Sequence, residues 1–308
     1  MDVKAEVKLS RLSALLRRSL WLDMLTEAEV MGQVWQDPDF DPALLVTHER
    51  DEELAGAIFG VIRREKDATG GTERRVGYVK FIAVDPRYQR QGIGTGLLAR
   101  LEERLAEKGV EEIRVSGSAP CYLWPGVDVR YTGAYCFFLA RGYTRYSDAV
   151  NMRVDLATAP LDTVADEKHL AEKGIVVRRM EEGDREAVGT WIARTFGENW
   201  RWETLATLNR QPVAAFIALQ PDSPPGEEVI GFAAYAGNRR NWFGPMGTDP
   251  RARKLGVGRT LLRLCLRDLR EMGYTDAQIA WTGPVAFYAR TVEARMDRVF
   301  YLLRRSLH

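Results

Sequence analysis

An internal repeat constrains this chain more than any other feature of its sequence. Asp85-Pro86-Arg87 recurs as Asp249-Pro250-Arg251, 164 residues further along the chain. The same offset relates further matched positions, namely Gly92 to Gly256, Gly94 to Gly258, Leu97-Leu98 to Leu261-Leu262 and Gly109 to Gly273. Chance does not supply an ordered set of matches that shares one spacing, whereas duplicated structural units do. The sequence therefore predicts two similar halves.

The length agrees with this division, because 308 residues suit two domains of about 150 residues each. Residues 156–173 interrupt the apolar pattern with proline and charged side chains, which indicates a polar connector. We expect one domain over residues 1–160 and a second over 174–308, with the boundary near residue 160.

Composition excludes several classes of protein. Lysine and arginine number 44 against 43 acidic residues, so the net charge of +1 gives no reason to expect nucleic acid or an anionic membrane as a partner. The three cysteines and three histidines are dispersed, which argues against a disulfide framework and a metal site and favours a reducing compartment. With no apolar run of about 20 residues, we expect a soluble cytoplasmic protein.

The second half has the clearer pattern of elements. Strands are expected near 175–177, 214–219, 229–235, 243–248, 277–281 and 299–303, and helices near 184, over 261–272 and over 285–292. The first half repeats this order, with a helical region over 12–34, strands near 44–47, 55–63, 77–84 and 113–116, and a helix over 94–108. Phe137 and Phe287 are only 150 residues apart, so the first half carries 14 additional residues, which include Pro120–Gly133.

In each half an apolar strand ends in Asp-Pro-Arg, followed by a basic or amide-rich turn, Gly-x-Gly and an amphipathic helix. Glycine lets the backbone approach a ligand and reach positive φ, and the free N–H groups at a helix N-terminus bind phosphate. The alternative is a glycine-rich surface turn, which two copies in matched context disfavour. Neither loop is a Walker loop, because neither contains Gly-Lys-Ser/Thr. Neither is a dinucleotide-binding fingerprint, because Leu97 and Leu261 stand where that motif has its third glycine.

Both loops resemble the [Gln/Arg]-x-x-Gly-x-[Gly/Ala] signature of the GNAT family of N-acetyltransferases, and the resemblance covers nearly the whole chain twice. The tandem layout is similar to that of mycothiol synthase. The resemblance implies an α/β (α+β) fold of two tandem GNAT-like domains, each a mixed, mostly antiparallel sheet flanked by helices. It also implies acetyl-CoA as the acyl donor.

The family binds the pyrophosphate of coenzyme A on the loop and the pantetheine arm along the preceding strand. Transferred by position, the strand residues are Ile82, Ala83 and Val84, and Met246, Gly247 and Thr248. The loop residues are Gln89, Arg90, Gln91, Gly92, Ile93, Gly94 and Thr95 in the first half, and Arg253, Lys254, Leu255, Gly256, Val257, Gly258 and Arg259 in the second. Pro245 is unusual inside such a strand, because proline cannot donate to a ladder.

The family commonly uses a tyrosine on the helix after the fifth strand to protonate the departing thiolate. Tyr288 matches this position, with packing on an apolar helix face as its alternative role, whereas Phe138 of the first half has no acidic proton. Tyr122, Tyr131 and Tyr135 remain open as substitutes there. For the general base, the sequence offers Glu198, Glu203 and Asp128 only by region, with surface carboxylates or a water relay as alternatives. Trp200, Trp202 and Trp281 are candidates for an acceptor pocket or for the core.

The sequence thus indicates acetyl-CoA-dependent N-acetylation of a primary amine on a small molecule, without a metal. The alternative is a non-catalytic acyl-CoA-binding sensor or structural module. Fold alone does not name the acceptor.

Overall fold

The computed structural model describes residues 8–66, 73–224 and 226–307. The chain forms two compact units, unit 1 with Met1–Ala149 and Phe300–His308, and unit 2 with Val150–Val299. These units differ from the contiguous halves 1–160 and 174–308 expected from the sequence. The difference arises because the end of the chain completes the sheet of unit 1, while residues 150–155 complete the sheet of unit 2.

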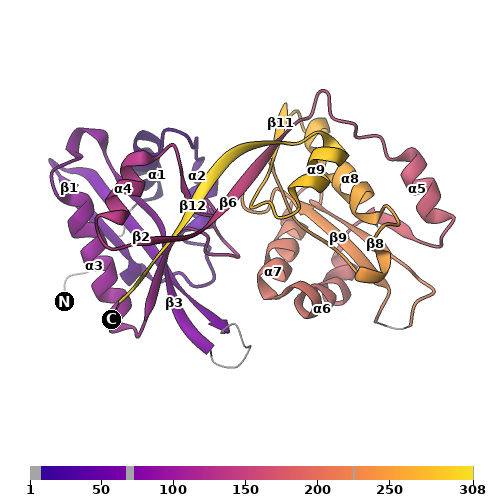
Figure 1. The fold of residues 1–308 in the computed structure, drawn as a ribbon, viewed down its shortest axis with the longest axis horizontal. Helices are drawn as coiled ribbons and strands as arrows, with labels where there is room; N and C mark the ends of the chain where they lie inside the picture. The colour runs from indigo at the N-terminus through magenta and orange to yellow at the C-terminus, as the bar shows by residue number, and fades with distance from the viewer. Residues whose placement is uncertain (1–7, 67–72, 225, 308) are drawn as a thin grey trace. The chain divides into compact units, whose positions relative to one another are not determined.

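In unit 1 the strands of the sheet follow the order β1-β2-β3-β4-β12, and the short strand β5 also pairs with β12 (Figure 1). Strands β3 and β4 are parallel, and the other neighbours are antiparallel. Its elements are α1 (Leu9–Ser19), α2 (Glu27–Gln33), β1 (Leu45–Arg50), β2 (Glu53–Lys66), β3 (Glu73–Val84), α3 (Ile93–Glu107), β4 (Glu112–Val115), β5 (Val127–Asp128) and α4 (Thr132–Leu139), with the end of β12 (Arg295–Ser306).

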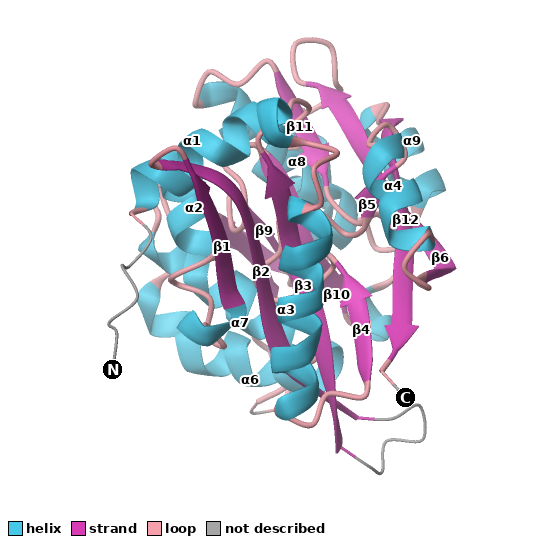
Figure 2. Ribbon diagram, turned by 90° about the vertical axis from the view of Figure 1, so that its left-hand side faces the viewer, coloured by secondary structure: helices cyan, strands magenta, loops and turns pink. Residues whose placement is uncertain are grey.

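Alternate residues of β2 face opposite layers of helices, as the two-residue period of a strand requires. Phe59 packs with Leu12 and the rest of the α1–α2 layer. Its neighbour Ile58 packs with Leu97 and the α3 layer. Figure 2 shows α3 on one face of this sheet and α1 and α2 on the other. The mostly apolar strand expected at 55–63 is therefore confirmed as a strand that is buried on both faces.

Unit 2 contains a six-stranded sheet in the order β7-β8-β9-β10-β11-β6, in which β10 and β11 are the parallel pair. Its elements are α5 (Val164–Ala171), β7 (Val176–Arg179), α6 (Arg185–Phe196), α7 (Glu198–Ala206), β8 (Ala215–Leu219), β9 (Val229–Tyr235), β10 (Trp242–Thr248), α8 (Val257–Glu271), β11 (Asp276–Ile279) and α9 (Val285–Val292), with the end of β6 (Thr144–Asp155).

The same two-layer logic holds in unit 2. Phe232 packs with Trp191 in the α6 layer, and its neighbour Ala233 packs with Leu261 in the α8 layer. Both units are therefore mixed, mostly antiparallel sheets covered by helices on two faces, which confirms the predicted fold class.

One expectation about the helices was wrong, and the structure gives detail to another. The segment 156–173 is no simple polar connector, because it includes α5, and Asp166 on this helix accepts hydrogen bonds from Arg259 and Arg263 on α8. The helical region expected over 12–34 is two helices. It is divided because Thr26 and Glu29 form a capping box that starts α2 anew.

None of the helices in the described part of the chain combines the length and the apolarity that a membrane span requires.

Candidate active site

Two parallel strands separate at the centre of each unit. In unit 1 the pairing of β3 with β4 ends at Val79 and Val115, although β3 continues to Val84. In unit 2 the pairing of β10 with β11 ends at Phe243 and Ile279, which are the positions 164 residues later. The two halves therefore open at the same point of the repeat.

The separation exposes an edge of β3. The N–H of Asp85 donates to the carbonyl of Ala55 on β2. Because backbone groups alternate along a strand, Ala83 also faces β2, while Ile82 and Val84 direct their backbone groups to the open edge. At this edge the carbonyl of Val84 accepts a hydrogen bond from the side-chain amide of Gln89, and all three strand residues expected to bind pantetheine line the cavity.

The corresponding strand of unit 2 has the same alternation. The N–H of Asp249 donates to the carbonyl of Ile230 on β9. Gly247 therefore faces β9, and Met246 and Thr248 face the open edge. Pro245 lies where the register shifts between Phe243 and Met246, so it occupies a place without a ladder pair.

The loop after each strand has a repeated backbone conformation. Gly92 and Gly256 precede α3 and α8 with φ of 84° and 100°. Arg90 and Lys254, the matched residues two positions earlier, are also left-handed, with φ of 61° and 66°. Neither residue is a glycine, so a pattern of glycines alone does not reveal this shared strain. The loop is thus a specific structure built twice.

An aspartate fixes the start of each loop. The side chain of Asp85 accepts the N–H of Arg87, and that of Asp249 accepts the N–H of Arg251. Hydrogen bonds from Arg87 and from Arg18 hold the pKa of Asp85 well below its ordinary value, so the carboxylate stays ionised. The recurrent Asp-Pro-Arg therefore has a structural role in turning the chain toward the glycines.

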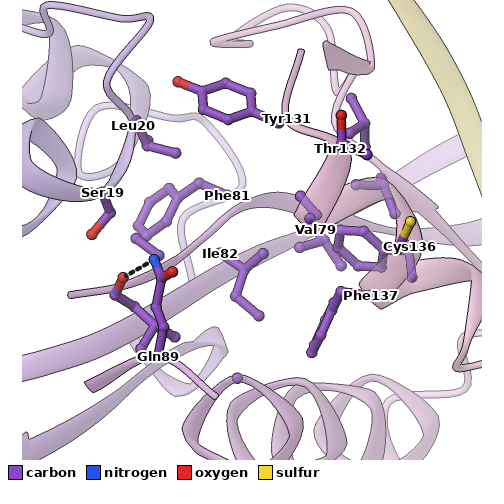
Figure 3. Close-up of a pocket in the computed structure, with 18 of the residues that line it drawn as sticks. Ser19, Leu20, Val79, Phe81, Ile82, Gln89, Tyr131, Thr132, Cys136 and Phe137 are labelled. Carbon is purple, nitrogen blue, oxygen red and sulfur yellow. Dashed lines mark hydrogen bonds between the residues drawn. The ribbon is translucent and has the colours of Figure 1, made fainter. Parts of the chain in front are cut away.

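A cavity of about 950 Å³ lies between the separated strands, the loop and α4 of unit 1 (Figure 3). This volume is within the range of small-molecule and cofactor sites. Its wall includes the side of the loop formed by Gln89, Arg90, Gly92, Gly94 and Thr95. The side chain of Ile93 instead packs in the core, and Gln91 accepts a hydrogen bond from Arg50 away from the cavity.

Four arginines line the cavity, namely Arg18, Arg90, Arg130 and Arg141. Arg18 and Arg130 are ion-paired with Asp85 and Asp128, and Arg141 donates to the hydroxyl of Thr95 on the first turn of α3. The first intrahelical bond recorded at this terminus runs from Gly96 to Gly92, so the N–H groups of the three residues between them have no acceptor within the helix. Free N–H groups beside arginines suit a pyrophosphate. Sequence reasoning missed Arg18 and Arg141, because both are distant from the loop in the chain.

In unit 2, several expected loop residues have structural partners. Val257 is buried in the core, Leu255 packs against it, and Arg259 pairs with Asp166 of α5. Arg253, Lys254, Gly256 and Gly258 remain at the turn. A Cβ on Gly258 would lie 3.7 Å from the ring of Phe287, and a Cβ on Gly94 would lie 3.3 Å from Phe137.

Tyr288 and Phe138 occupy matched positions behind these rings. Tyr288 is 6% exposed, with its ring beside those of Phe243 and Phe287. No residue in the described ranges hydrogen-bonds to its hydroxyl, and burial raises the pKa of Tyr288 above its ordinary value. The phenol is therefore protonated at neutral pH. Phe138 is buried and contacts Tyr143.

The three candidate bases have different environments. Glu198 is a surface carboxylate that accepts from Arg201, and Asp128 is buried in an ion pair with Arg130. Glu203 on α7 is buried, and its burial raises its pKa to about 8, with a hydrogen bond from Asn238 acting in the opposite direction. Glu203 thus has a pKa suited to proton exchange near neutral pH.

The insertion of the first half contributes to the wall of this cavity. Its residues Trp124, Asp128, Arg130 and Tyr131 line the same cavity as the loop from Gln89 to Thr95. Of the three tryptophans, Trp200 packs against Phe196 and Phe232, and all three are about one-third exposed, with none fully in the core.

Comparisons with known proteins agree with this geometry. The model of the acetyltransferase (GNAT) family matches residues 15–121 and 180–291, which is more than half of the chain. An acetyltransferase of Sodalis glossinidius is 31% identical over 85 residues, which are 26% of this chain and 56% of that protein. A mycothiol acetyltransferase of Geodermatophilus obscurus is 28% identical over 245 residues, covering 71% of this chain and 68% of that protein.

Among solved structures, a tandem GNAT protein from the clavulanic acid biosynthesis pathway superimposes with a TM-score of 0.68 at 13% identity, covering 99% of this chain and 97% of that one. This likeness concerns the fold. The match with the Sodalis protein spans little more than half of that relative's length. From the two matched segments and the duplicated loops, the chain belongs to the GNAT acetyltransferase family.

Proposed function

We propose that this protein is an N-acetyltransferase that moves the acetyl group of acetyl-CoA to a primary amine of a small molecule. The observation that carries the proposal is the coincidence, in both units, of an open strand edge, a left-handed glycine loop and a helix N-terminus. A relative named mycothiol acetyltransferase supports a small-molecule acceptor.

The residues fit coenzyme A in three respects. The open edge of β3 offers the backbone groups of Ile82 and the N–H of Val84 to an amide-bearing chain such as pantetheine, while the carbonyl of Val84 accepts from Gln89. The loop from Gln89 to Thr95, with Arg141, offers N–H groups and positive charge to a pyrophosphate. The cavity of about 950 Å³ has the size of a cofactor site. In unit 2 we assign Met246, Thr248 and the turn from Arg253 to Arg259 to the same role.

Acetyl-CoA supplies an acetyl thioester, and this chain has to position it and manage two protons. We assign Tyr288 the proton donation to the departing thiolate, because its phenol is protonated and no described group occupies its hydroxyl. Glu203 is the proposed base of unit 2 on the strength of its buried carboxyl. We infer a reducing compartment such as the cytoplasm, which the three free cysteines support.

A non-catalytic acyl-CoA-binding module is the second candidate, and Phe138 favours it for unit 1 alone. One assay separates the transferase from the binding module. It measures the release of coenzyme A from acetyl-CoA with glucosamine, glycinamide and spermidine as acceptors, and the mass shift of the amine confirms acetylation. Turnover on one amine supports the transferase. Micromolar binding of acetyl-CoA without turnover on any amine would leave the binding module as the function.

A further inference from the structure

One tyrosine of unit 1 stands out from the three that the sequence left open. Tyr131 lies in the wall of the cavity, at the N-terminus of α4 (Figure 3). Tyr135 is on the same helix, but its ring packs on Tyr301 at 5.0 Å between centroids, and Tyr122 is buried away from this wall. The fold thus brings one phenol of the three to the place where an acceptor would lie.

The hydroxyl of Tyr131 is held by the segment that joins α1 to α2. It accepts the N–H of Leu22 at 3.1 Å and donates its proton to Oδ2 of Asp23 at 3.0 Å. Asp23 is 1% exposed. Since the phenol proton points to a buried carboxylate, the tyrosine oxygen faces other groups as a hydrogen-bond acceptor. This is the opposite of Tyr288, whose proton has no described acceptor.

We propose that unit 1 is a second acetyl-transfer site, in which Tyr131 is the catalytic residue that receives the proton of the acceptor amine and Asp23 is a positioning residue. This inference rests on the proposed function. The amine nitrogen bonds to the thioester carbon, its N–H proton moves to the oxygen of Tyr131, and the phenol proton moves to Asp23. The carbon–sulfur bond then breaks, and the proton returns through the pair to the thiolate, which leaves an amide, free coenzyme A and an unchanged pair.

The same pair determines the class of acceptor. A carboxylate that is removed from water attracts a cation more strongly than an exposed one does, because the surrounding dielectric is lower. The indole of Trp21 stands edge-on to Tyr131 at 5.9 Å, and Leu20 and Thr132 complete this part of the wall. Unit 1 therefore attracts a small primary amine in its ammonium form to the Tyr131–Asp23 pair, and the ammonium releases one proton to solvent before the neutral amine attacks the thioester.

The test isolates unit 1 within the full chain by using Gly256→Glu as the background, with the amine that the panel of glucosamine, glycinamide and spermidine identifies. In this background we expect residual turnover, and we expect Tyr131→Phe to lower kcat about 10²-fold, a typical loss for a general base. The acetyl-CoA Kd should stay within about twofold, because the ring remains in place. Asp23→Asn keeps an oxygen for the phenol proton but is a weaker base, so kcat should fall about tenfold with the acetyl-CoA KM unchanged. Tyr135→Phe is the matched control and should keep the background kcat.

The outcomes separate this inference from the proposed function. Two results would overturn the assignment of unit 1 and leave the proposed function intact, provided that the parent chain turns over. In the first, Tyr131→Phe keeps the kcat of the background. In the second, the Gly256→Glu background is inactive although it still binds acetyl-CoA. If Asp23→Asn raises the KM for acetyl-CoA and leaves kcat unchanged, the pair has a structural role and takes no part in proton transfer. A parent chain without turnover on any amine overturns both.

Discussion

Gly56 on β2 lies so close beneath Ile93, the first residue of α3, that a Cβ on the glycine would be 2.9 Å from Cγ2 of the isoleucine. In unit 2, a Cβ on Gly231 of β9 would be 2.8 Å from Cγ1 of Val257, the first residue of α8. Each half thus uses a glycine on the neighbouring strand to seat the start of the loop helix against the sheet. The loops could not approach the open strands in the same way with a larger residue there.

Gly56→Val should therefore displace the N-terminus of α3. We expect the free energy of unfolding to fall by about 1–3 kcal/mol, as for overpacked cores, and the affinity for acetyl-CoA to fall with it. Urea denaturation and calorimetric titration measure the two effects. Gly32→Ala is the control, because its Cβ would be 3.7 Å from Oε1 of Gln36, an ordinary contact. Parental affinity in Gly56→Val would show that the seat of α3 does not determine binding.

Glutamate at the loop glycines should remove the coenzyme sites one at a time. Gly92 and Gly256 have positive φ, where a side chain is strained, and a carboxylate at this place would repel a pyrophosphate. We expect titration with acetyl-CoA to show two sites in the parent and one in each variant. Gly109→Glu is the control. Gly109 also has a positive φ, of 75°, so the variant has the same backbone strain, but it lies beyond the far end of α3 and should keep both sites. Unchanged stoichiometry in both loop variants would contradict the assignment.

Tyr288→Phe removes a hydroxyl and keeps the ring between Phe243 and Phe287. If the phenol protonates the departing thiolate, kcat of unit 2 should fall about 10²-fold while acetyl-CoA binds as before. Steady-state kinetics in a Gly92→Glu background isolate unit 2. Tyr274→Phe, which alters another partly buried tyrosine against the same core, should leave kcat unchanged. A parental rate in Tyr288→Phe would assign this residue to packing.

Glu203 makes the stability of the protein depend on pH. Its folded pKa of about 8 lies above its ordinary value of 4.5, so between these pH values the folded state holds a proton that the unfolded state has lost. Stability is then fully present below about pH 4.5 and falls as the pH rises toward about 8. Glu203→Gln is neutral at every pH and should flatten this part of the profile. Urea midpoints from pH 5 to pH 9 measure it, with Glu198→Gln on the surface as the control. An unchanged slope in Glu203→Gln would show that its carboxyl is ionised when folded.

The sequence by itself determined the repeat, the glycine loops and the elements around them. These features depend on local chemistry, in which strand and helix periods, Asp-Pro-Arg turns and Gly-x-Gly are read from neighbouring residues. The opening of the strands at Val79 and at Phe243 follows from the same repeat. Helix α5 was missed because its eight residues, Val164–Ala171, have little amphipathic pattern, and the pairing of Asp166 with α8 adds to its stability.

The tertiary structure alone decided three matters, because each depends on residues far apart in the chain. It placed the end of β12 beside β4, and so assigned Phe300–His308 to unit 1. It selected Tyr131 over Tyr135 and Tyr122, since the selection rests on Asp23, which is 108 residues away from Tyr131. It also distinguished Glu203 from Glu198. Burial raises the pKa of the Glu203 carboxyl, and the sequence does not show which of two glutamates on one short helix is buried.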